Sequence, residues 1–130
     1  MNPEKPRVAV VSFTDPRPVA LIEEREAYIK EKHKELVKYL EDKGFRVIDP
    51  MGKIPRPKKE FFGLSTTKEV EACASILTSE GAEALVISAS HLSALPGDYT
   101  REVEVACKLL DIPVIRLDDN SDMERFLETL

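Results

Sequence analysis

Short runs of apolar residues alternate along this chain with longer segments in which apolar residues recur every three or four positions. The first run, Val8–Phe13, is rich in β-branched residues and is followed by turn-forming residues, which is typical of a central strand covered on both faces. Helical spacing follows from about Val19 to Lys43, and Gly44 fits the position just after a helix. The same alternation continues to the end of the chain. It predicts strands over residues 8–13, 45–48, 84–89 and 113–117, and helices over residues 19–43, 65–81, 100–110 and 122–130.

Four strand–helix pairs in succession predict a parallel sheet, because a right-handed crossover helix returns each strand in the same direction. The default arrangement is a flavodoxin-like three-layer α/β/α fold with a four-stranded parallel sheet in the order 2-1-3-4. A length of 130 residues fits a single domain over residues 1–130. Four strands are few for this architecture, which leaves room for an edge strand from another chain or a following domain.

Polar residues follow each predicted strand. Because the carboxyl ends of parallel strands share one edge of the sheet, and ligands of open α/β sheets bind outside that edge, these residues form a candidate site. An arginine fork, carboxylates, a hydroxyl and an imidazole suit a small polyhydroxylated or anionic ligand. The residues at this edge are Asp15, Arg17, Asp49, Ser90, His91, Asp118 and Asp119.

Three polar residues, Arg25, Glu26 and His33, lie on the apolar stripe of the first predicted helix. Charged side chains that face inward are costly unless they are paired or used. Arg25 and Glu26 are near the ligand-binding edge, so we consider both a site role and a structural ion pair. His33 is in the middle of the helix, where a histidine with satisfied hydrogen bonds or partial exposure is the better interpretation.

The segment 51–64 contains Phe61 and Phe62 among several basic residues. It could fold over a ligand or a neighbouring subunit, or its rings could simply pack on the domain. Aromatic residues among basic ones also bind single-stranded nucleic acid, but the net charge of -5 disfavours that partner. Val105 and Leu109 form a second apolar strip on the third helix, which indicates a subunit contact or scattered surface residues.

The composition, with 42% hydrophobic and 33% charged residues, is that of a globular protein. The sequence shows neither a bilayer-length apolar run nor a signal peptide, so we expect a cytoplasmic protein without a membrane partner. Cys73 and Cys107 fall on apolar helix faces, which favours buried reduced thiols over a disulfide or a reactive thiol. The absence of glutamine, the scarcity of asparagine and the abundance of Glu and Lys are typical of hyperthermophile proteins.

Several established site patterns are missing. Neither G-x-G-x-x-G nor G-x-x-x-x-G-K-[ST] follows the first strand, which argues against dinucleotides and nucleoside triphosphates, and the phosphate-binding loop of a flavodoxin is absent too. A response-regulator receiver would need an acid after the third strand, where Ser90 and His91 stand. The two histidines and two cysteines lack metal-ligand spacing, and neither cysteine has a histidine placed to activate it.

Several motifs occur in an order that resembles the amino-terminal domain of the L-fucose isomerase family, whose relatives include L-arabinose isomerase. The first strand of that family ends in Asp-x-Arg, and the next helix opens with Arg-Glu. A later strand ends in a polar loop with Pro-Gly and an aromatic residue, followed by a helix and Ile-Pro. The matching residues here are Asp15-Pro16-Arg17, Arg25-Glu26, Ser88 to Ser90, Pro96-Gly97, Tyr99 and Ile112-Pro113.

The resemblance implies aldose–ketose isomerisation with a divalent metal, commonly manganese, in a hexamer whose amino-terminal domain lends residues to a neighbouring active site. It assigns substrate contact to Arg17, and His91 or Tyr99 could replace an aromatic residue of the family. The family's metal ligands come from later domains. This chain would therefore be a substrate-recognition and assembly domain, inactive alone and without a cofactor of its own, whose partners are a sugar, the remaining isomerase domains or subunit, and further copies of itself.

Two other functions remain open at this point. The chain could be a stand-alone module that binds a sugar or sugar phosphate, or a purely structural oligomerisation domain. For either sugar-binding function, we expect substrate contacts from Asp15, Arg17, Arg25, Glu26, Ser90, His91 and Tyr99.

Overall fold

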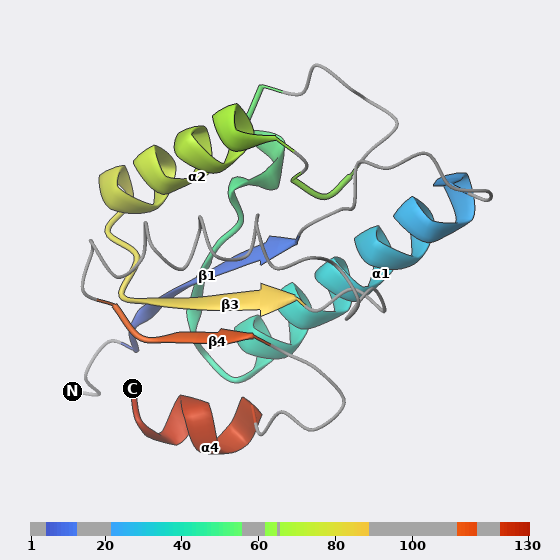
Figure 1. Cartoon of the computed structure of the whole chain (residues 1–130). Coiled ribbons are helices and arrows are strands. Elements are labelled where there is room, and N and C mark those ends of the chain that lie inside the picture. Colours follow the sequence, from blue (N-terminus) through green and yellow to red (C-terminus); the bar gives the residue numbers. More distant parts are fainter. Residues whose placement is uncertain (1–4, 13–21, 56–61, 65, 89–111, 117–122) are drawn as a thin grey trace.

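The computed structural model describes residues 5–12, 22–55, 62–64, 66–88, 112–116 and 123–130 (Figure 1). The predicted third helix, with Cys107, Val105 and Leu109, lies outside these residues. The elements in chain order are β1 (Arg7–Ser12), α1 (Ile22–Asp42), β2 (Arg46–Ile48), the 3-10 turn η1 (Pro50–Gly52), α2 (Thr67–Ser79), β3 (Ala84–Ser88), β4 (Val114–Arg116) and α4 (Met123–Glu128).

The four strands form one parallel sheet in the order β2-β1-β3-β4, which confirms the predicted topology. The central strands β1 and β3 pair from Val8 opposite Ala84 to Ser12 opposite Ser88. β2 pairs only with the first half of β1, from Arg7 to Ala9. The other half of β1 therefore needs a different backbone partner on that side.

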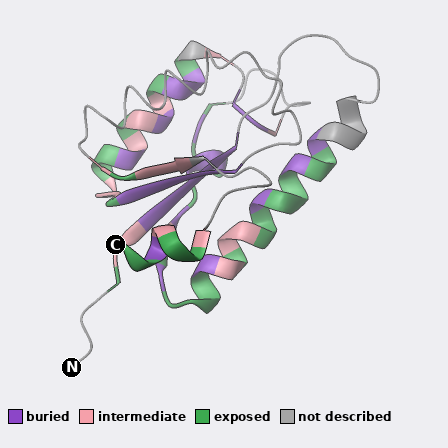
Figure 2. Cartoon of the chain, turned by 60° about the horizontal axis from the view of Figure 1, so that its bottom comes forward, coloured by how far each residue is buried: buried purple, intermediate pink, exposed green. Residues whose placement is uncertain are grey.

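Helices cover both faces of the sheet, so the fold is a flavodoxin-like three-layer α/β/α sandwich (Figure 1). Side chains alternate between the two faces of a strand. Ala9 and Val11 of β1 accordingly pack with α2, whereas Val8 and Val10 pack with α1 and α4. Figure 2 shows buried residues along the strands and on the sheet-facing sides of the helices. On α2 the buried residues are Glu69, Val70, Cys73 and Leu77.

Local capping signals fix the helix ends. Gly44 and Gly81 follow α1 and α2 with φ angles of 92° and 72°, a left-handed conformation that glycine adopts without steric cost. Phe45 N–H closes α1 by donating to Leu40 O (3.1 Å), which explains why β2 begins one residue later than predicted. At the other end of α2, Thr66 is the N-cap residue: Glu69 N–H donates to Thr66 Oγ1 (3.2 Å), and the Thr66 hydroxyl donates to Glu69 Oε1 (3.1 Å).

Two further sequence predictions concern single features. Cys73 is a buried thiol that is not part of a disulfide, as expected. Within the part of the chain that the structure describes, none of the helices has the length and apolarity needed to cross a bilayer.

Candidate functional site

The polarity of the central strands changes at their carboxyl ends. β1 is apolar and buried from Val8 to Val11 and then ends in Ser12, while β3 is apolar and buried from Ala84 to Ile87 and then ends in Ser88. The two serines are register partners. By strand alternation both belong to the sheet face that α1 covers. Two hydroxyls therefore stand side by side at the edge where ligands of this fold bind.

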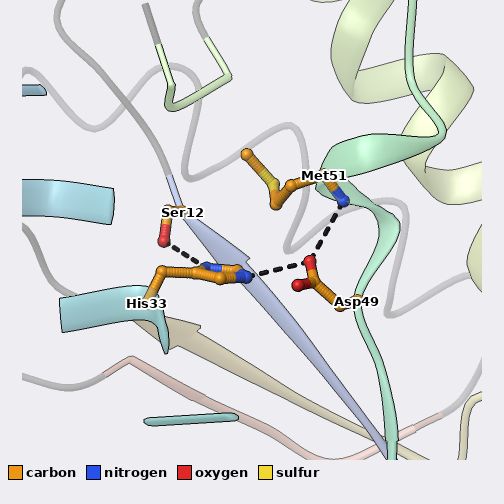
Figure 3. A network of polar contacts seen from close by, with 4 residues as sticks. All are labelled: Ser12, His33, Asp49 and Met51. Carbon is orange, nitrogen blue, oxygen red and sulfur yellow. Dashed lines mark hydrogen bonds and ion pairs between the residues drawn. The ribbon is translucent and has the colours of Figure 1, made fainter. Parts of the chain in front are cut away.

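His33 of α1 connects this edge to β2 (Figure 3). Its side chain is 1% exposed, with Nδ1 2.7 Å from Ser12 Oγ and Nε2 2.9 Å from Asp49 Oδ1. A carboxylate can only accept, so Nε2 carries the proton, and in the neutral imidazole Nδ1 accepts from the Ser12 hydroxyl. The prediction of a histidine with satisfied hydrogen bonds is confirmed.

The Ser12–His33–Asp49 chain has the residue types of a nucleophilic triad, in which a base activates the serine and a carboxylate orients the base. Ser12, however, is 0% exposed, and its main-chain oxygen is bound by the N–H of Leu64 (2.9 Å). A substrate carbonyl cannot reach Oγ in this arrangement. The chain therefore acts as an internal brace that fixes the positions of its two ends.

Residues 62–64 fill the side of β1 that β2 leaves open. Leu64 is fully buried and donates to Ser12 O, as a neighbouring strand would. The ring of Phe62 contacts His33 edge-on, with a centroid distance of 5.2 Å. Phe62 also packs against the core cluster on the α2 side. Ring packing on the domain is therefore the correct interpretation for Phe62, whereas Phe61 lies outside the described residues.

Glu26 anchors the same segment to α1. Its side chain is buried, and Oε1 accepts the N–H groups of Phe62 (2.7 Å) and Gly63 (3.3 Å). One carboxylate oxygen thus binds two consecutive main-chain N–H groups. Glu26 therefore holds residues 62–64, in the connection between β2 and α2, against α1. Its predicted substrate contact or ion pair stays a prediction.

Of the other predicted substrate contacts, Asp15, Arg17, Ser90, His91 and Tyr99 lie outside the described residues. Arg25 belongs to α1, but its side chain is outside them as well. The grouping of the rim residues after β1 and β3 therefore stays a prediction.

Sequence reasoning did not connect Ser12, His33 and Asp49. Two signals were present: His33 interrupts the apolar stripe of α1, and Asp49 directly follows β2. A polar residue on a buried face needs a partner. The pairing joins residues 21 and 16 positions apart, which only the topology brings together.

The electrostatic environment keeps Asp49 ionised. Burial of its carboxyl raises the pKa, but the hydrogen bond and charge of His33, the N–H of Met51 and the charge of Lys53 outweigh burial. The net effect lowers the pKa below its ordinary value of 3.8.

A pH dependence of stability follows from this lowered pKa. A carboxyl whose pKa is lower in the folded than in the unfolded protein stabilises the fold above the unfolded pKa, and this stabilisation is lost as pH falls through the folded value. We expect the difference in unfolding free energy between the wild type and Asp49→Asn to be constant near neutral pH and to shrink below pH 3.8. Urea unfolding from pH 7 downward measures it; a difference that stays constant in acid would contradict the prediction.

The manganese implied by the family resemblance requires several carboxylate or imidazole ligands at one point. Within the described ranges, no group of three or more His, Cys, Asp and Glu residues could hold a metal ion. At the carboxyl edge, His33 is already bonded to Ser12 and Asp49 through both ring nitrogens. The described residues of this edge therefore do not fit a metal centre.

A cavity of about 300 Å³ lies at the opposite end of the sheet. Its lysines have partners: Lys5 lies 4.8 Å above the ring of Phe45, and Lys43 is 3.7 Å from Glu124. Its lining residues are Lys5, Lys43, Phe45, Glu124, Leu127 and Glu128, none of which follows the end of a strand at the polar carboxyl edge.

The fold and this edge define a flavodoxin-like α/β domain with buried hydroxyls at the ends of its two central strands and a braced carboxylate beside them. Comparisons of the chain with protein-family models, with curated proteins and with solved structures gave no match.

Proposed function

We propose that this chain is a sugar-recognition domain that binds a polyhydroxylated molecule at the carboxyl edge of its sheet. By its resemblance to L-fucose isomerases, it would be the substrate-recognition and assembly part of a ketol-isomerase. The observation that supports this proposal best is the register of Ser12 with Ser88. These paired hydroxyls mark the junction of β1 and β3, where the strand order reverses and where doubly wound folds bind their ligands.

The chemistry of the edge agrees with a hydroxyl-rich ligand. Binding sites for small molecules combine a largely apolar lining with a few fixed polar groups. Among the described residues, the fixed polar group that is open to solvent is the Asp49 carboxylate, which can accept hydrogen bonds from sugar hydroxyls. The buried Ser12 and His33 hold this carboxylate in place from behind. Arg17, which follows β1 in the sequence, would add a guanidinium donor.

A titration of the isolated chain tests the recognition function. We expect L-fucose, L-arabinose or another member of a pentose and deoxyhexose panel to shift amide resonances of the ¹⁵N-labelled protein saturably. The shifts should be concentrated at the carboxyl edge, with Met51 and Leu64 as described reporters and Ala82 at the opposite end as the reference. A panel without saturable shifts would refute the proposal.

A second experiment tests the link to isomerases. Mixed with metal-binding domains of an L-fucose isomerase, the chain should support conversion of L-fucose to its ketose, and Arg17→Ala should reduce that rate. The chain alone should show none, because the resemblance implies that the metal ligands needed for the proton or hydride transfer come from later domains. Equal kinetics for the wild type and Arg17→Ala would refute the isomerase role but not sugar binding.

A further inference from the structure

The two oxygens of the Asp49 carboxylate have different environments. Oδ1 accepts from His33 Nε2 (2.9 Å) and from Met51 N–H (3.2 Å), so it serves both the brace and the cap of η1. Oδ2 accepts no hydrogen bond from the described residues. In Figure 3, Oδ2 lies on the side of the carboxylate away from Met51. The side chain is 44% exposed, so one oxygen is available to a molecule from outside.

Asp49 is also unusually well fixed for an exposed carboxylate. His33 is buried, is bonded to Ser12 at its other nitrogen and is in edge-on contact with Phe62, so it cannot turn away. A ligand that binds Oδ2 therefore need not immobilise the Asp49 side chain, which is the usual entropic cost of using a surface carboxylate.

A nearby lysine does not occupy this oxygen. Lys53 contributes to the lowered pKa of Asp49 through its charge, but its Nζ is bonded to Glu80 at 2.7 Å. Oδ2 is thus an ionised, oriented acceptor that is suited to a hydrogen-bond donor. Asp49 directly follows β2, and β2 pairs in parallel with β1, which ends in Ser12. Asp49 therefore lies at the same edge of the sheet as the paired serines Ser12 and Ser88.

We propose that Asp49, which the sequence placed only at this edge without a defined role, is a ligand-binding residue. Its Oδ2 accepts a hydrogen bond from a hydroxyl group of the bound sugar, while His33 holds the carboxylate in place. This assignment rests on the proposed sugar-recognition function. It adds to that function a specificity residue, because Asp49 would favour sugars that carry a hydroxyl group at the ring position facing Oδ2.

The first test compares the affinity for L-fucose, or for the panel sugar that binds most tightly, between the wild type and Asp49→Asn. Loss of the charge on the acceptor should weaken binding about tenfold. Asp42→Asn, at the exposed end of α1, is the matched control and should leave the affinity unchanged. In the wild type, the ¹³C resonance of the Asp49 carboxylate should also shift on addition of the sugar, a measurement that does not require the variant to fold.

Monodeoxy analogues of the sugar provide the sharper test. Removal of the hydroxyl that contacts Asp49 should weaken binding to the wild type about tenfold but should cost Asp49→Asn much less, because the interaction is already lost. Two results would overturn the role of Asp49 and leave sugar recognition intact. One is that Asp49→Asn binds the sugar as tightly as the wild type does. The other is that each deoxy analogue loses the same affinity in both proteins. A wild type that binds no sugar would overturn both proposals.

Discussion

Replacing His33 with alanine should lower the free energy of unfolding by about 3–5 kcal/mol, a large share of the total stability of a domain this size. The imidazole is 1% exposed and bridges Ser12 to Asp49. Its removal leaves a cavity and deprives the buried Ser12 hydroxyl of its partner, and each of these effects is costly. Urea unfolding monitored by circular dichroism measures the change.

Two further variants separate loss of the network from simple loss of volume. Lys34→Ala, at the exposed neighbouring position of α1, should change stability by less than about 0.5 kcal/mol. Ser12→Ala should destabilise the wild type by about 1–2 kcal/mol. In the His33→Ala background the same substitution should cost much less, because the hydrogen bond between Ser12 and His33 is already absent there. Strictly additive effects would show that the hydrogen bond contributes nothing and would contradict the prediction.

The elements that were predictable from the sequence are those whose signals are local. Gly44 and Gly81 end helices because each is the residue that reverses the backbone after a helical stripe. Thr66 begins α2 because its partner Glu69 is only three residues away. The sheet order followed from the alternation of strands and helices, since handedness leaves few ways to connect them.

The site was less predictable because its contacts join residues far apart in the sequence. The sequence marked His33 and Glu26 as polar residues on a buried face, but it did not show which residues would be their partners. The partners of Glu26, Phe62 and Gly63, are in place because β2 does not cover the second half of β1, where residues 62–64 lie alongside Ser12 instead. β2 stops at Ile48, opposite Ala9, because Asp49 caps the 3-10 turn η1 that begins at Pro50.

The interpretation of Glu26 can be tested directly with two substitutions. Glu26→Ala removes the acceptor of two main-chain N–H groups, those of Phe62 and Gly63, and should destabilise the protein by about 2–4 kcal/mol. Glu26→Gln retains an oxygen that can accept both hydrogen bonds and loses only the charge, so it should cost less than half as much. Chemical denaturation gives both values.

Hydrogen exchange shows whether the loss is localised where the contacts predict. In Glu26→Ala, the amides of Phe62 and Gly63 should exchange faster by a larger factor than that of Val86 in the centre of β3. Glu31→Gln, an exposed position on the same helix, is the control and should change neither stability nor exchange. The alternative is that Glu26 serves only to contact substrate. Glu26→Gln would then weaken sugar binding, and both Glu26→Ala and Glu26→Gln would keep the wild-type stability and exchange rates. That result would reject the anchoring role, because a segment bonded through two N–H groups to one buried carboxylate cannot lose that carboxylate without cost.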